Sequence, residues 1–192
     1  MKDVFIVDGA RTAFASFGGS FANTGATELG TATAIEALKR SNIDPEQVDH
    51  VIYGNVIHTE KNASYLARHI GLKSGVPQEV PALTLNRLCG SGLQAVVSAA
   101  QHILVGDAEI VLAGGTENMS RSPYSSFTQR FGGTKMGNIE FVDMLTTTLT
   151  DQYTGKGMGM TAEKLAEIHQ ISREEQDAFA LESNKRAARA RE

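Results

Sequence analysis

Short apolar runs alternate with longer amphipathic stretches over the first 115 residues of the chain. The run 109–115 is continuously apolar after its first residue, which is typical of a strand that helices cover on both faces of its sheet. Strands separated by helices in this way predict an α/β fold with a mostly parallel mixed sheet between helices. The predicted strands are residues 4–7, 51–57, 80–85 and 109–115, and the predicted helices are residues 28–40, 45–48, 64–73 and a segment that follows Cys89 and ends at Gly106.

The pattern changes after Gly115. Residues 119–138 are rich in Ser, Gly and Arg and show no clear period. Helices are predicted beyond them, and the last one opens with a Ser-x-x-Glu capping box. Its modest apolar face has to rest on another surface, because a short isolated helix is only marginally stable in water. We therefore expect an α/β domain over residues 1–118 and a second, helical domain over residues 119–192. The predicted helices of the second domain are residues 139–149, 161–170 and 173–191.

The composition excludes several classes of function. The chain has 192 residues, 41% of them hydrophobic and 21% charged, which is enough for one sizeable core. Its net charge is −4 without a sustained basic stripe, so binding to nucleic acid or to an anionic membrane has no electrostatic support. No apolar run is expected to approach the length of a membrane span. A single cysteine excludes an internal disulfide framework, and with no signal-like segment at the start we expect a cytoplasmic protein.

The histidines do not predict a metal site. None of the five is paired at metal-ligand spacing, and none has a partner cysteine. A phosphate-binding P-loop is also absent from the sequence. We therefore expect no metal and no permanently bound cofactor, which leaves Cys89 as the candidate nucleophile.

Cys89 lies between a predicted strand and a predicted helix, in the run Asn-Arg-Leu-Cys-Gly-Ser-Gly. A thiol at the first turn of a helix faces unpaired N–H groups and the positive end of the helix dipole, which favour the reactive thiolate. Gly90 and Gly92 leave room for a substrate near the sulfur. Two other interpretations stay open. A lone cysteine is often a small buried hydrophobe, and Gly90-x-Gly92-x-x-Ala95 weakly resembles a dinucleotide-binding fingerprint.

A catalytic cysteine normally needs a base within hydrogen-bond reach. No residue near Cys89 in the sequence supplies one, and His102 lies more than three helical turns further along the chain. We therefore expect the base to come from outside this chain.

Several segments resemble the thiolases, the acetyl-CoA acetyltransferases and β-ketothiolases. They occur in the family's order and correspond to its N-terminal half. We expect a thiolase-like layered domain followed by a partial helical loop domain. The resembling segments are residues 8–12 (Asp-Gly-Ala-Arg-Thr), 80–95 around the cysteine, 114–120 (Gly-Gly-Thr-Glu-Asn-Met-Ser), 133–137, 158–163 and 172–177.

The resemblance implies a reaction and a set of site residues. Cys89 would be acylated by an acyl-CoA, and the acyl group would pass to the carbanion of acetyl-CoA or, in reverse, to CoA thiolate. The backbone N–H of Cys89 would form part of an oxyanion hole. Leu149 and Met158 match family positions that line the pantetheine and acyl pocket. Residues 119–138 resemble the start of the loop domain, with the hairpin by which dimers pair into tetramers, so a homodimer or tetramer is expected.

Two departures from the family pattern stand out. Gly157 occupies a position that is often His in biosynthetic members. The activating histidine and the acid/base cysteine belong to the second half of a thiolase, which this sequence does not contain. The resemblance therefore implies a chain that is inactive alone and needs a second chain carrying the C-terminal half. The alternative is a non-catalytic acyl-CoA-binding or regulatory subunit with the same half-fold, while a ketosynthase fits the segments less well.

Overall fold

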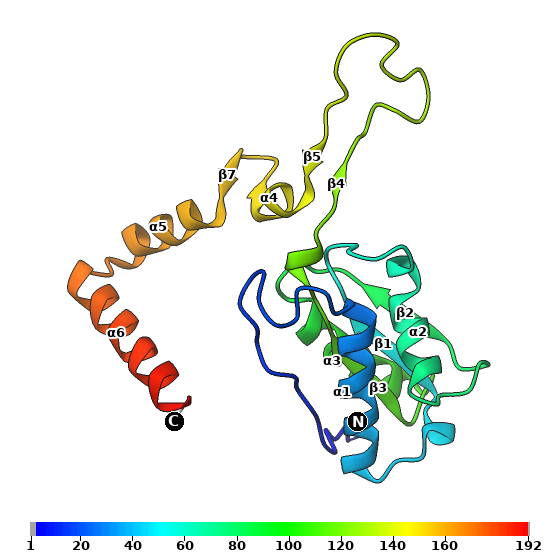
Figure 1. Cartoon of the computed structure of the whole chain (residues 1–192). Helices are drawn as coiled ribbons and strands as arrows, with labels where there is room; N and C mark the ends of the chain where they lie inside the picture. The colour runs from blue at the N-terminus through cyan, green and yellow to red at the C-terminus, as the bar shows by residue number, and fades with distance from the viewer. Residues whose placement is uncertain (1–2, 192) are drawn as a thin grey trace. The chain divides into compact units, whose positions relative to one another are not determined.

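A computed structural model describes residues 3–191 of the chain (Figure 1). The chain divides into two compact units, Met1–Leu145 and Thr146–Glu192. The first unit contains the α/β fold that the sequence predicts, and the second is mostly helical.

Three parallel strands form the central sheet, in the order β2-β1-β3. The central strand β1 is rich in β-branched and aromatic residues, which suit a strand packed on both faces. Each crossover passes through a helix, because parallel neighbours cannot be joined by a tight turn. The bounds of the strands are β1 (His50–Gly54), β2 (Ala82–Leu85) and β3 (Val111–Gly115).

Helices cover both faces of this sheet (Figure 1). Val51 and Tyr53 of β1 point into a core shared with α1 (Ala26–Ser41) and α2 (Leu66–Lys73). Ile52, between them in the strand, points to the opposite face and packs on alanines of α3 (Ser91–Val105). The alternation follows from the period of two in a strand, and it confirms the predicted helix-sheet-helix layers.

The connections between these elements are short. A 3-10 helix, Pro45–Gln47, precedes β1 where the sequence predicts a short helix, and a capping box from Asp44 closes its start. Two further 3-10 helices precede α2 and follow β3. Their bounds are Ala63–Tyr65 and Met119–Arg121.

An arm of the first unit follows residue 121. It is held by β4 (Tyr124–Ser125) and β5 (Val142–Asp143), which pair antiparallel, and it leads into α4 (Met144–Leu149). The helix predicted over residues 139–149 is therefore wrong in its first part, because the residues of β5 pair with β4 instead of continuing the helix.

The boundary between the compact units differs from the predicted domain boundary at residue 118. Two hydrogen bonds tie the residues just beyond it to the start of the chain. Gly18 N–H donates to Ser120 Oγ (2.9 Å), and the Arg121 side chain donates to the carbonyl of Asn23 (3.1 Å). The start of the predicted second domain is thus anchored in the first unit.

The second unit is a hairpin followed by two helices. The strands β6 (Thr150–Asp151) and β7 (Lys156–Gly157) lead into α5 (Met158–His169) and α6 (Arg173–Arg189). The capping box at the start of α6 is formed as predicted. None of the described residues of α5 and α6 is buried.

The strand predicted over residues 4–7 is not formed. This segment has no regular secondary structure, and Phe5 and Ile6 are 77% and 81% exposed. A strand needs a hydrogen-bonded partner, and this segment is separated from the outer edge of β3 by a cavity of about 1010 Å³. A run of four apolar residues therefore did not decide the structure of this segment.

The prediction that no apolar run approaches the length of a membrane span was wrong for one segment. By length and composition alone, Leu88–Val105 is long and apolar enough to cross a membrane, with a mean hydropathy of 1.3. It contains α3, whose inner side packs on β1 and β3, as expected for the core helix of an α/β fold.

The amino ends of the strands carry a pair of histidines. The ring centroid of His50, at the start of β1, lies 4.5 Å from the ring centroid of His102 in α3. Burial, followed by the charge of His102, lowers the pKa of His50 from its usual 6.5, and the smaller effects of the Val51 carbonyl and Asp107 oppose this. The folded protein therefore takes up a proton at His50 less readily than the unfolded chain does.

This difference predicts a loss of stability in mild acid. Above pH 6.5 the folded protein keeps its full free energy of unfolding as far as His50 is concerned. The free energy of unfolding declines as the pH falls below 6.5 toward the lower pKa of the folded state, because only the unfolded chain gains the proton there. In the variant His50→Gln, the free energy of unfolding should depend less steeply on pH between about 7 and 5. Urea unfolding at several pH values measures this. An unchanged slope in the variant would contradict the prediction.

Candidate active site

Cys89 is exposed, which excludes the interpretation as a small buried hydrophobe. It lies in the turn between β2 and α3. The prediction that Cys89 belongs to the first turn of the helix was wrong by two residues, because the helix begins at Ser91 with Gly90 as its N-cap. The thiol is therefore held by the turn in front of the helix.

The start of α3 rests directly on the carboxyl ends of β1 and β3. A Cβ atom on Gly54 would lie 2.6 Å from the Ser91 carbonyl carbon, and one on Gly115 would lie 3.1 Å from Gly92 Cα. Glycine at these strand ends thus permits a backbone contact that a side chain would prevent. The contact places the Cys89 turn at the edge of the sheet where parallel α/β folds commonly carry their sites.

A compact set of hydrogen bonds fixes the turn itself. Asn86 Oδ1 accepts a hydrogen bond from Leu88 N–H (2.8 Å), and Gly90 N–H donates to the Arg87 carbonyl (3.1 Å). The Arg87 and Gln94 side chains are also hydrogen bonded. Leu88 has a positive φ of 48°, which is unfavourable for a leucine and requires support from its surroundings.

A second group of polar residues lies at the same ends of the strands. The Glu117 carboxylate accepts hydrogen bonds from Val56 N–H (2.9 Å), Ile57 N–H (3.1 Å) and Asn55 Nδ2 (3.0 Å). Loss of solvation raises the pKa of Glu117, against the effect of these three hydrogen bonds. Buried Asn118 donates to the carbonyls of residues 21 and 24. This pair, in the Gly-Gly-Thr-Glu-Asn run, therefore holds together loops that are distant in sequence.

We expect Glu117→Gln to destabilise the protein by about 1–2 kcal/mol. The amide group has one acceptor oxygen in place of two, so either Val56 N–H or Ile57 N–H would face an NH₂ group and lose its partner. Urea unfolding measures the loss, with Glu79→Gln as an exposed control. Equal stability of Glu117→Gln and the unmodified chain would contradict this account.

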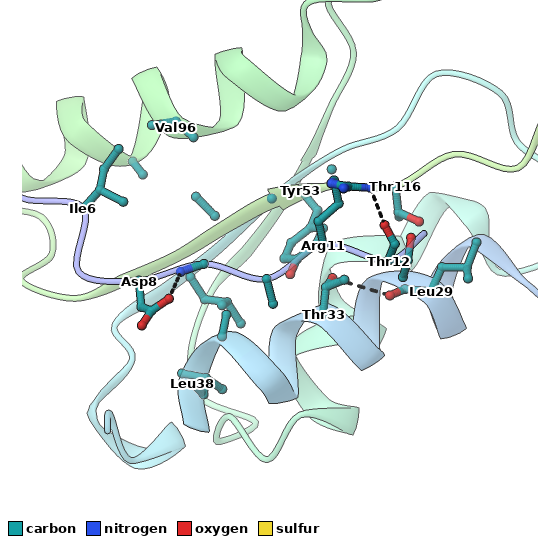
Figure 2. A pocket seen from close by; sticks show the side chains of 18 of the residues that line it. Ile6, Asp8, Arg11, Thr12, Leu29, Thr33, Leu38, Tyr53, Val96 and Thr116 are labelled. Carbon is teal, nitrogen blue, oxygen red and sulfur yellow. Dashed lines mark hydrogen bonds between the residues drawn. The ribbon is translucent and has the colours of Figure 1, made fainter. Parts of the chain in front are cut away.

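The cavity beside β3 is separate from the cysteine. It is lined by the N-terminal segment, α1, α3 and β3, and Cys89 is not among its lining residues. Figure 2 shows Arg11 of the N-terminal segment, Thr33 of α1 and Tyr53 of β1 around this space. Burial raises the pKa of Tyr53 to about 12, so its hydroxyl remains neutral at physiological pH.

The two predicted substrate-binding residues lie on either side of the hairpin formed by β6 and β7. Leu149 ends α4 and Met158 begins α5, and the two residues are 44% and 49% exposed. Thr150 pairs with Gly157 in the hairpin, so the chain at Leu149 and the chain at Met158 adjoin the same residue pair. Both side chains are available to a ligand, and their role in binding one stays a prediction.

His50 and His102 lie at the amino ends of the strands, whereas the Cys89 turn follows the carboxyl end of β2. Among residues 3–191, no group of three or more His, Cys, Asp or Glu side chains could hold a metal ion.

Sequence reasoning missed the roles of Ser91, Glu117 and Asn118. Glu117 and Asn118 stand in a run that matched the family pattern, but their contacts join segments about sixty to one hundred residues apart. An acidic residue followed by an amide residue just after an apolar strand was the available signal for these two. For Ser91 the only signal was its position two residues after the cysteine.

Comparison with known proteins places the chain in a family. Residues 4–192 match the family described as "Thiolase, N-terminal domain", and the chain therefore belongs to the thiolase family. It is 50% identical over 187 residues to the human mitochondrial 3-ketoacyl-CoA thiolase, covering 97% of this chain and 47% of that protein. It is 47% identical over 189 residues to Beta-ketothiolase BktB of Cupriavidus necator, covering 98% of this chain and 48% of that one.

Solved structures agree with this assignment. The crystal structure of the human mitochondrial 3-ketoacyl-CoA thiolase in complex with CoA matches with a TM-score of 0.91 and 48% sequence identity. The match covers 97% of this chain and 48% of that chain. This confirms the thiolase-like fold. The chain spans about half the length of the relatives that it matches.

Proposed function

We propose that this chain is the nucleophile-bearing half of a thiolase, which transfers acyl groups between acyl-CoA and acetyl-CoA or CoA through an acyl-cysteine. The observation that carries the proposal is the exposed Cys89, held where α3 meets the carboxyl ends of the sheet in a thiolase fold. The Cys89 thiolate attacks the thioester carbonyl, a new carbon–sulfur bond forms, and CoA leaves as its thiolate. The Cys89 N–H contributes to an oxyanion hole for the intermediate.

The acyl group then leaves Cys89 in one of two directions. In synthesis the carbanion of acetyl-CoA attacks the acyl carbon, a carbon–carbon bond forms, and the Cys89 thiolate is released. In thiolysis the Cys89 thiolate attacks the 3-keto carbonyl of a 3-ketoacyl-CoA, the carbon–carbon bond breaks, and acetyl-CoA leaves as its carbanion, which takes up a proton. A CoA thiolate then attacks the acyl-cysteine, releases the Cys89 thiolate and yields an acyl-CoA. Both directions use CoA thioesters as substrates and no permanently bound cofactor. Leu149 and Met158 are proposed to line the pantetheine and acyl pocket, and their exposure is compatible with that role.

A second chain with the C-terminal half completes the site in this proposal. The human relative is about twice as long as the matched region, and the His50–His102 pair of this chain lies at the other ends of the strands from the cysteine turn. The partner supplies the activating histidine and the acid/base cysteine. The isolated chain is then inactive, because acylation and release both need proton transfer.

The assembly is proposed to be a homodimer or tetramer of the completed enzyme. The arm between β4 and β5 supports this, because it presents large apolar side chains to solvent. Phe131 and Met136 are 89% and 93% exposed. Such a surface is usually covered by another protein. The cytoplasmic location stays a prediction.

The test is thiolysis of acetoacetyl-CoA by this chain alone and by its mixture with a polypeptide that spans the missing half. We expect turnover in the mixture and none in either part. Full turnover by this chain alone would refute the split site. Binding of acetyl-CoA without turnover in the mixture would favour the non-catalytic acyl-CoA-binding subunit.

A further inference from the structure

The side chain of Ser91 closes the turn that carries Cys89. Its hydroxyl donates a hydrogen bond to the Leu88 carbonyl (2.6 Å) and accepts one from Arg87 N–H (2.8 Å). Ser91 N–H donates to the same Leu88 carbonyl (3.0 Å). Ser91, which follows Cys89 in the chain, is thus bonded to the two residues that precede it, and these hydrogen bonds close the turn around the cysteine.

Ser91 is placed to act on the backbone alone. Its exposed fraction is only 5%, whereas Cys89 is exposed, so a substrate at the sulfur does not need to contact the serine. The residue rests on Gly54, whose missing side chain leaves room for it. Ser91 is therefore fixed against the sheet on one side and against the turn on the other.

The turn needs this support because Leu88 has a left-handed backbone. A φ of 48° costs a leucine energy that neighbouring contacts have to offset. Without the hydroxyl, Arg87 N–H loses its acceptor, and the Leu88 carbonyl keeps only the backbone hydrogen bond from Ser91. The turn can then relax to an ordinary backbone, which moves the sulfur away from its place in front of α3.

We propose that Ser91 is a positioning residue for the nucleophile: its buried hydroxyl holds Leu88 in the left-handed conformation and so fixes where the sulfur of Cys89 lies. This role rests on the proposed function, because a fixed sulfur matters only if Cys89 reacts. Ser91 acts through the turn and touches no reacting atom.

The first experiment uses the chain alone and needs no partner. The rate of Cys89 alkylation by iodoacetamide is measured in folded protein and in urea, for the unmodified chain, Ser91→Ala, Ser91→Thr and the control Ser98→Ala. Ser98 lies on the same helix, and its hydroxyl accepts a hydrogen bond from the Gln94 side chain. Circular dichroism confirms that each variant is folded. We expect the folded unmodified chain to react faster than in urea, and Ser91→Ala to lose that excess. Ser91→Thr and Ser98→Ala should retain it.

The outcomes separate the two proposals. If the unmodified chain reacts equally fast folded and unfolded, the proposed nucleophile fails. If the folded chain reacts faster and Ser91→Ala reacts just as fast, the positioning role of Ser91 is overturned. Loss of the excess in both folded Ser91 variants also overturns it, because the hydroxyl would then not be the operative group.

The second experiment measures steady-state kinetics in the mixture with the missing half. We expect Ser91→Ala to lower kcat about 10- to 100-fold and to leave KM for acetoacetyl-CoA within about twofold, because the substrate pocket is intact and only the nucleophile is displaced. A rise in KM at constant kcat would overturn the assignment, since it would place Ser91 in substrate binding.

Discussion

Replacing Cys89 by alanine is expected to abolish acyl transfer in the mixture of this chain with the missing half. The thiolate is the group that forms the covalent intermediate, and removing a nucleophile lowers kcat by about three orders of magnitude or more. Stability should change by less than about 0.5 kcal/mol, because the side chain is exposed. The measurement is the initial rate of acetoacetyl-CoA thiolysis, together with the melting temperature of the variant.

The matched variant is Cys89→Ser, which keeps the size of the side chain and its place in the turn. A serine hydroxyl is a much weaker nucleophile than a thiolate at neutral pH, so this variant should be inactive as well. Mass spectrometry after incubation of the mixture with acetyl-CoA should find an acyl group on the unmodified chain and none on either variant. Normal turnover by Cys89→Ala would exclude this residue as the nucleophile.

The parts of the fold that were predictable are those decided by local chemistry. The capping box at Ser172 fixed the start of the last helix, because it satisfies backbone N–H groups within three residues. The apolar run that became β3 identified a strand packed on both faces. For these elements the sequence neighbours are also the spatial neighbours, which makes the pattern informative.

The predictions that failed concern segments whose structure depends on partners distant in the sequence. Residues 4–7 have the composition of a strand, but a strand forms only where another strand pairs with it. The cavity beside β3 separates residues 4–7 from β3. The start of α4 was misplaced because Val142 pairs with Ser125, seventeen residues earlier in the chain. Neither partner is visible in a local pattern.

The candidate site shows the same division. The nucleophile could be proposed from the Cys-Gly-Ser-Gly run and the family resemblance. The left-handed Leu88, the buried Ser91 hydroxyl and the contact with Gly54 could not, because they depend on how α3 lies on the sheet. The sequence marked these positions only as glycine at a strand end and serine after the cysteine.

Gly54 affects both the stability of the fold and the position of the cysteine turn. The residue is buried at the end of β1, and a Cβ atom added to it would lie 2.6–2.7 Å from the backbone and Cβ of Ser91. A backbone cannot move aside as a flexible side chain can. A valine here would therefore push the start of α3 off the sheet.

We expect Gly54→Val to destabilise the protein by about 3 kcal/mol or more, at the upper end of the cost of overfilling a packed core. The displacement acts on Ser91, so the folded-state excess in Cys89 alkylation should disappear even under conditions where most of the variant is folded. The matched control is Gly9→Val, because a Cβ atom at Gly9 would meet open space. Urea unfolding and iodoacetamide alkylation measure the two effects. If Gly54→Val were as stable as Gly9→Val and equally reactive, α3 would not be seated on the strand ends in solution, and the structural basis for a fixed nucleophile would be lost.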